Sequence, residues 1–157
     1  MISNIMVVGS GVMGRGIAYT GALGGFYVTV VDVNPAALDS ARTEIEAIIE
    51  KGIRYGKISE SAAGEMRERL SFSSAIEEAA ASAELIIEAV PEKEAIKKAV
   101  YETIEKHAKA DCYFATNTST MSPTEIASYA NRPEKTIAMH FFNPVHKMPL
   151  VEIVRGL

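Results

Sequence analysis

A glycine-rich segment near the N-terminus restricts the fold more than any other feature of the sequence. Residues 9–14 read Gly-Ser-Gly-Val-Met-Gly, a G-x-G-x-x-G pattern between an apolar strand-like stretch (4–9) and a helix-like stretch (14–24). A second apolar stretch, 27–32, ends on an acid, Asp32, 18 residues after the third glycine. Such a unit requires two parallel strands joined by a right-handed helical crossover.

Apolar runs and helix-like stretches continue to alternate along the chain. We expect further strands at 84–90, 112–116, 136–141 and 150–154, and helices over 35–52, over 93–109 and from Ser122. Residues 53–70 are strongly charged and look helical from Ser59 onward, so they are interpreted as a helical excursion at the edge of the domain. The alternation predicts an α/β fold: one Rossmann-type, doubly wound, mostly parallel sheet spanning residues 1–157.

Composition excludes several classes of protein. The net charge is −4 without a Lys/Arg cluster, which argues against nucleic acid or an anionic membrane as a partner. No apolar run reaches the roughly 18–20 residues that span a bilayer, and no signal peptide is visible. Cys112 is the single cysteine, interpreted as a core residue, so no internal disulfide is expected. We therefore expect a cytoplasmic protein, and no metal site is assigned.

The glycine-rich segment predicts a dinucleotide site. Its residues Gly9, Ser10, Gly11, Val12, Met13 and Gly14 would place free N–H groups of a helix N-terminus against a pyrophosphate. Asp32 would accept hydrogen bonds from the adenosine ribose and repel a 2′-phosphate, and no arginine follows it over 33–35, so NAD is favoured over NADP. The alternative is that the glycines only shape a turn and that Asp32 only ends a strand.

Three polar clusters follow predicted strands, at the edge where parallel α/β sheets bind ligands. They are Glu88 to Glu92 with Lys97, Thr116 to Ser119, and His140 to Pro144 followed by Glu152. Taken alone, His140 would be interpreted as a hydrogen-bonded core residue. The prolines that follow it, however, allow the last strand to return and to place Glu152 beside the imidazole. A histidine oriented by a buried acid is a general-base arrangement, and Glu152 is otherwise an unexplained charge in an apolar strand.

Together these motifs resemble the L-3-hydroxyacyl-CoA dehydrogenase family, including 3-hydroxybutyryl-CoA dehydrogenases. The resemblance rests on G-x-G-x-x-G, the I-I-E-A-V-x-E segment at 86–92, N-T-S at 117–119, and H-F-F-N-P-V with a later L-V-E at 140–152. It implies an NAD-dependent oxidoreductase of fatty acid β-oxidation or butanoate metabolism. The substrate would be an acyl-CoA, oxidised at a 3-hydroxyl or formed by the reverse reduction.

The resemblance also implies roles for individual residues. His140 would be the catalytic base and Glu152 the acid that orients it. Ser119 would bind the substrate oxygen beside the nicotinamide, with Asn143 close by, while Glu92 and Lys97 would line the nicotinamide end of the cofactor. From the residues alone, Ser119 could be a loop hydroxyl, Asn143 a turn former and Lys97 a solvated lysine. His107 and His146 are interpreted as surface residues.

One departure from the family bears on activity. Its members continue into a helical C-terminal domain that completes the acyl-CoA cleft and makes a homodimer contact. These 157 residues do not include such a domain, so we expect either a fragment or a stand-alone domain. Two other functions therefore stay open. A related sugar-acid 3-dehydrogenase shares the architecture, although the Phe141-Phe142 pair favours the acyl-CoA enzyme. A non-catalytic NAD-binding module fits the missing domain but not the His140–Glu152 pair.

Overall fold

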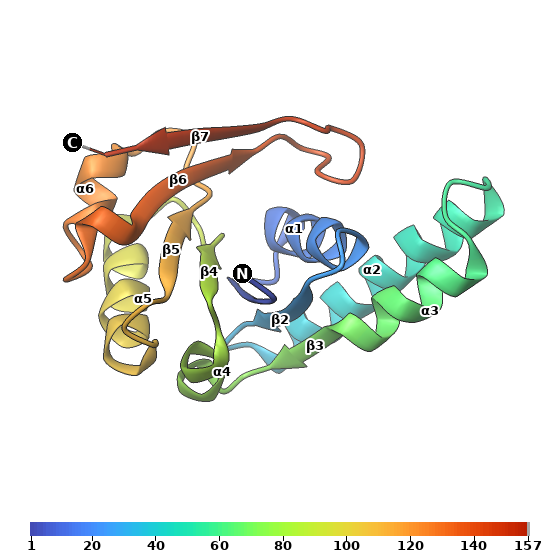
Figure 1. Ribbon diagram of the computed structural model, residues 1–157, viewed down its shortest axis with the longest axis horizontal. Coiled ribbons are helices and arrows are strands. Elements are labelled where there is room, and N and C mark those ends of the chain that lie inside the picture. The colour runs from blue at the N-terminus through green and yellow to red at the C-terminus, as the bar shows by residue number, and fades with distance from the viewer. Residues whose placement is uncertain (157) are drawn as a thin grey trace.

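A seven-stranded sheet organises the chain in the computed structural model, which describes residues 1–156. The strands lie in the order β3-β2-β1-β4-β5-β6-β7 (Figure 1). Their bounds are β1 Asn4–Val8, β2 Tyr27–Val31, β3 Leu70–Ser73, β4 Leu85–Glu88, β5 Tyr113–Thr116, β6 Thr136–Phe141 and β7 Val151–Arg155. Neighbouring strands from β3 to β6 pair in parallel, and β7 pairs antiparallel with β6.

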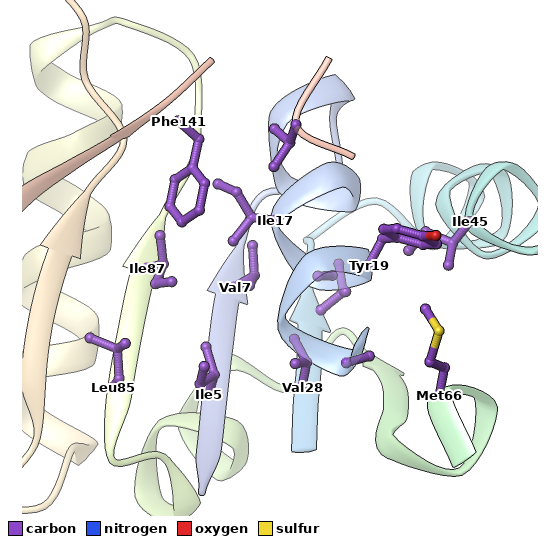
Figure 2. Close-up of a cluster of buried hydrophobic side chains, with 14 of the residues drawn as sticks. Ile5, Val7, Ile17, Tyr19, Val28, Ile45, Met66, Leu85, Ile87 and Phe141 are labelled. Carbon is purple, nitrogen blue, oxygen red and sulfur yellow. The ribbon is translucent and has the colours of Figure 1, made fainter. Parts of the chain in front are cut away.

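Helices cover both faces of this sheet. They are α1 Val12–Leu23, α2 Pro35–Arg54, α3 Glu60–Arg69, α4 Ile76–Ser82, α5 Glu94–His107 and α6 Pro123–Ala127, with a short 3-10 helix at Pro133–Lys135. Ile5 and Val7 of β1 belong to a core cluster with residues of α1, α2 and α3 (Figure 2). Met6 and Val8 belong to a second cluster with residues of α4, α5 and α6. Burial on both faces explains why the strand is continuously apolar, and the predicted doubly wound α/β fold is confirmed.

The helical excursion is also confirmed. The α2–α3 pair extends away from the sheet (Figure 1), and Ala63 and Met66 of α3 are buried in the first core cluster. Ser59 caps α3, because its hydroxyl accepts a hydrogen bond from the N–H of Ala62 at 3.1 Å. Arg67 forms ion pairs with Glu46 and Glu50 of α2, which join the two helices on their exposed side.

Three elements were not predicted from the sequence, namely β3, α4 and the short 3-10 helix at Pro133–Lys135. β3 follows α3 directly and forms the edge of the sheet beside β2, and α4 crosses from it to β4. β3 consists of four residues, half of them serine, none fully buried. α4 has seven residues and no side-chain cap. None of the three is long enough for a periodic apolar pattern, which explains the omission. Among residues 1–156, no helix has the length and apolar character of a membrane span.

Candidate functional site

A cavity of about 910 Å³ lies along the carboxyl ends of the central strands. This volume is within the range of roughly 300–1,000 Å³ that is typical of small-molecule and cofactor sites. The glycine-rich segment and Asp32 line one part of it, and Ser119, His140 and Asn143 line another. The strand order reverses between β1 and β4, where α/β sheets of this type bind their ligands. The fold thus brings most of the sequence-predicted residues to one cavity.

The three glycines of the loop meet different steric demands. Gly9 has φ of 101°, and a Cβ atom there would lie 2.7 Å from the carbonyl oxygen of Ala89. A Cβ atom at Gly14 would collide with the carbonyl oxygen of Gly9, so this glycine allows α1 to pack against the strand. Gly11 is exposed, with nothing within 4 Å of the Cβ position. The backbone of Gly11 is therefore open to a ligand in the cavity.

The N-terminus of α1 supplies unpaired donors beside this open backbone. Gly11 is the N-cap and offers no side-chain hydrogen bond, and no acidic residue occupies the first turn. Helical hydrogen bonding starts with the N–H of Arg15, which donates to the carbonyl of Gly11 at 3.0 Å. The amides of Val12, Met13 and Gly14 thus have no acceptor within the helix. These amides and the positive end of the helix dipole fit an anionic pyrophosphate.

Asp32 follows β2 and is tied to the glycine loop. One carboxylate oxygen accepts hydrogen bonds from the N–H and hydroxyl of Ser10, at 2.9 and 2.7 Å, and the other accepts from the N–H of Asn34 at 3.0 Å. Burial raises the pKa of Asp32, but hydrogen bonds from Asn34, Ser10 and Val33 outweigh burial and leave the pKa below its ordinary value. Asp32 is therefore a fixed, ionised carboxylate on the cavity wall.

His140 and Glu152 face each other across the β6–β7 pair. They are register partners, and Nδ1 of His140 lies 2.9 Å from Oε2 of Glu152. The imidazole also packs against Phe142, with ring centroids 4.6 Å apart. The side chains are 25% and 55% exposed, so the expectation of a buried acid is wrong. β7 is the edge strand and all five of its residues are exposed, which leaves Glu152 open on the side away from His140.

Glu92 connects the polar cluster after β4 with the loop after β5. Its carboxylate accepts a hydrogen bond from the hydroxyl of Thr118 at 2.9 Å and one from the N–H of Ser119 at 3.3 Å. Ser119 itself is exposed in the cavity, as is Asn143 beyond β6. The loop that contains Asn143 packs on α1, since a Cβ atom at Gly16 would lie 2.8 Å from Val145. The α1 helix thereby supports both ends of the cavity.

Lys97 lies below the cavity and does not line it. Its side chain is 1% exposed, and its ammonium contacts both carboxylate oxygens of Glu88, at 2.8 and 2.9 Å. The ammonium is 3.8 Å from Glu92, which does line the cavity. The expectation that Lys97 itself lines the nicotinamide end of the cofactor site is therefore corrected, because α5 directs the lysine into the protein. The alternative of a solvated lysine is wrong for the same reason.

Three residues of the Thr116 to Ser119 cluster were given no role from the sequence. Thr116 donates its hydroxyl to Glu88, and Thr118 is buried and donates its hydroxyl to Glu92. Asn117 donates its backbone N–H to the carbonyl of Glu88 and accepts, at its side-chain Oδ1, a hydrogen bond from the N–H of Phe141. The only sequence feature that could have indicated their roles is their position at the end of a buried strand or directly after it. His107 and His146 are exposed and Cys112 is buried, as predicted.

The fold and the cavity define a dinucleotide-binding domain of the Rossmann type. The chain belongs to the family described as "3-hydroxyacyl-CoA dehydrogenase, NAD binding domain", whose model matches residues 4–157. It is thus an NAD-binding domain, and the predicted family and cofactor are confirmed.

Individual relatives agree with this assignment. The chain is 41% identical to a probable 3-hydroxybutyryl-CoA dehydrogenase of Bacillus subtilis, over 99% of this chain and 54% of that protein. It is 39% identical to the fatty acid oxidation complex subunit alpha of Psychrobacter arcticus, over 99% of this chain and 21% of the relative. The crystal structure of (S)-3-hydroxybutyryl-CoA dehydrogenase from Ralstonia eutropha superposes with a TM-score of 0.95 at 32% identity, covering all of this chain and 55% of that structure. The chain spans about half the length of the two dehydrogenases and about a fifth of the fatty acid oxidation subunit.

Proposed function

We propose that this chain provides the cofactor domain and the general base of an NAD-dependent L-3-hydroxyacyl-CoA dehydrogenase. One observation carries the proposal: His140, which Glu152 holds through Nδ1, lines the same cavity as the glycine loop. Relatives whose names specify 3-hydroxybutyryl-CoA dehydrogenase support an acyl-CoA substrate. The reaction is oxidation of a 3-hydroxyacyl-CoA to a 3-ketoacyl-CoA, or the reverse reduction.

In this mechanism His140 transfers a proton, and Glu152 orients and stabilises the imidazole ring. Nδ1 of His140 is engaged by Glu152, so Nε2 is the ring nitrogen available to the substrate. It accepts the proton of the 3-hydroxyl group during oxidation and returns it during reduction. The ionised carboxylate of Glu152 stabilises the positive charge on the imidazolium and holds its tautomer. NAD held in this cavity would supply the acceptor for the hydride that leaves the hydroxyl-bearing carbon.

The remaining residues hold the two reactants. The free amides of Val12, Met13 and Gly14 would bind the pyrophosphate, and Asp32 would accept the ribose hydroxyls. Glu92, which the Thr118–Ser119 loop and Lys97 position, contacts the nicotinamide end. The hydroxyl of Ser119 and the amide of Asn143 donate to the substrate oxygen. Holding the reacting atoms in this geometry is a large part of the rate enhancement in two-substrate reactions.

The substrate cleft in this proposal has a second wall outside residues 1–157. The two 3-hydroxybutyryl-CoA dehydrogenases are about twice as long as this chain. The family resemblance assigns the extra length to a helical domain and a homodimer contact. Large apolar residues on and next to β7 are exposed, among them Leu150, Ile153 and Val154, which fits a surface that packs against that domain. The cytoplasm is the proposed compartment.

Steady-state assays of the natural full-length protein test the proposed substrate. We expect NADH-dependent reduction of acetoacetyl-CoA, much weaker reaction with NADPH, and no reaction with NAD and a sugar acid. Activity with the sugar acid but not with acetoacetyl-CoA would reassign the enzyme to the related sugar-acid dehydrogenases. NAD binding without either activity would support a non-catalytic module.

A further inference from the structure

The end of β6, which contains His140, extends past the strand that supports it on one side. The parallel β5–β6 pairing ends at Thr116 and Ala138, whereas β6 continues to Phe141. On the other side the antiparallel pairing with β7 continues through Phe141 and Val151. At His140, therefore, β6 is paired on one side only, with the exposed edge strand β7. On the other side, β6 extends beyond its pairing with β5.

The side chain of Asn117 replaces the backbone acceptor that β5 does not provide for Phe141. Its side-chain oxygen, Oδ1, accepts a hydrogen bond from the backbone N–H of Phe141 at 2.9 Å. Its own backbone N–H donates to the carbonyl of Glu88, at the end of β4, at 2.8 Å. A carboxamide oxygen can replace a strand carbonyl as an acceptor for a backbone N–H. The residue after His140 is therefore anchored through Asn117 to the centre of the sheet.

We propose that Asn117 is a positioning residue for the general base, an inference that rests on the proposed function of His140. By fixing the N–H of Phe141, Asn117 holds the end of β6 so that Nδ1 of His140 stays on Glu152 and Nε2 stays directed at the substrate. β7 alone is an edge strand with five exposed residues, so it does not define that position rigidly. A displacement of about 1 Å at a reacting group costs on the order of 100-fold in rate.

Direct contact with a bound ligand is an alternative role for Asn117, and substitutions distinguish it from positioning. Asn117 also lines the cavity, so its Nδ2 group could donate directly to a bound ligand. Positioning requires the oxygen, whereas ligand contact requires the nitrogen. Asn117→Asp keeps the acceptor and removes the N–H donors, and Asn117→Leu removes both at similar volume. Asn131→Leu, at an exposed asparagine before the 3-10 helix, is the matched control.

Two spectroscopic readouts follow the proposed geometry without any assay of turnover. In the NAD-bound protein, hydrogen exchange of the Phe141 amide reports the bond to Asn117. The ¹⁵N spectrum of His140 reports its tautomer, because an ionised Glu152 requires the proton on Nδ1. We expect Asn117→Leu to speed exchange of Phe141 about 10-fold, the effect of one lost hydrogen bond, and to mix the tautomers. Asn117→Asp should keep both signals as in the unmodified protein.

Turnover of acetoacetyl-CoA by the full-length protein completes the test. We expect Asn117→Leu to lower kcat by roughly 10- to 100-fold while the Kd for NADH changes less than about twofold. Asn117→Asp should recover most of that loss. Equal loss in both variants, with Phe141 still protected in Asn117→Asp, would overturn the positioning role in favour of ligand contact. Unchanged exchange, tautomer and kcat in Asn117→Leu would also overturn it.

The outcome for His140 is separate from the outcome for Asn117. Full activity of a His140→Ala variant would remove the proposed function. The exchange and tautomer measurements would in that case still show whether Asn117 fixes the end of β6.

Discussion

Lys97 and Glu88 form an ion pair buried beneath the cofactor cavity, with Nζ 2.8 Å from Oε1 and 2.9 Å from Oε2. The carboxylate also accepts hydrogen bonds from the hydroxyl of Thr116 and the N–H of Val90, both at 2.8 Å. Removing two charges from water is unfavourable, and here the partners offset that cost. The pair ties α5 to the end of β4, directly below Glu92.

Removal of one charge from this pair should therefore destabilise the fold. We expect Lys97→Met to lower the free energy of unfolding by about 3–5 kcal/mol, because it leaves Glu88 buried and unpaired. Urea unfolding measures the change, and Lys98→Met, at an exposed neighbour on α5, is the control. The double variant Glu88→Gln/Lys97→Met should recover much of the loss, since the amide still accepts a hydrogen bond. Equal destabilisation by the two lysine variants would refute the structural role.

The sequence predicted those parts of the fold whose residues are buried on both faces of a strand or carry a glycine motif. β1, β2 and the glycine loop after β1 were predicted closely, because the strands are largely apolar and Gly9 and Gly14 leave no room for a side chain. β3 and α4 were missed because both are short: β3 is a partly buried edge strand, and α4 buries little more than two alanines. Their pattern does not differ from that of a loop.

Within the site, residue types were predictable but orientations were not. The sequence placed His140 and Glu152 together, since two proline breaks imply a returning strand, but the exposure of Glu152 depends on what covers β7. Lys97 looks like an ordinary helix lysine until α5 is placed on the sheet. The bond from Asn117 to Phe141 joins residues 24 positions apart, and no local pattern indicates it.

Asp32 should determine the choice between NAD and NADP. A fixed carboxylate at the ribose position accepts hydroxyls and repels a 2′-phosphate, so Asp32→Ala should weaken NAD binding and narrow the difference between the two cofactors. Fluorescence titration with NADH and NADPH measures both affinities. Asp39→Ala on the exposed side of α2 should leave them unchanged. Equal affinity of the unmodified chain for both cofactors would contradict the assignment.

The lowered pKa of Asp32 should appear in the pH dependence of stability. A carboxyl group whose pKa is lower in the folded than in the unfolded state stabilises the protein above its unfolded pKa of about 3.9, and this contribution is lost as pH falls through the folded value. The stability difference between the unmodified protein and Asp32→Asn should therefore be constant from pH 7 to about 5 and shrink below about 4. Urea unfolding at each pH tests this. If the stability difference between the two proteins grew toward acid pH, the pKa of Asp32 would be raised rather than lowered by folding.

Residues 1–157 alone should bind NAD but turn over acyl-CoA poorly. The phosphate loop, Asp32 and Glu92 all lie within these residues, whereas the proposed cleft has its second wall elsewhere. Calorimetry with NAD should show binding, while reduction of acetoacetyl-CoA stays near background. The full-length 3-hydroxybutyryl-CoA dehydrogenase of Bacillus subtilis, assayed in parallel, is the comparison. Turnover by residues 1–157 that matches this relative would show that the single domain builds a complete site.

The pair at the β6–β7 edge is central to the proposed chemistry, and His140→Ala in the full-length protein tests it most directly. The measurement is kcat for acetoacetyl-CoA reduction together with the Kd for NADH, with His107→Ala, at an exposed histidine of α5, as the control. We expect kcat to fall by about 10²- to 10⁴-fold, the usual contribution of general acid–base catalysis, with NADH affinity retained. Turnover equal to that of the His107→Ala control would remove His140 from the mechanism.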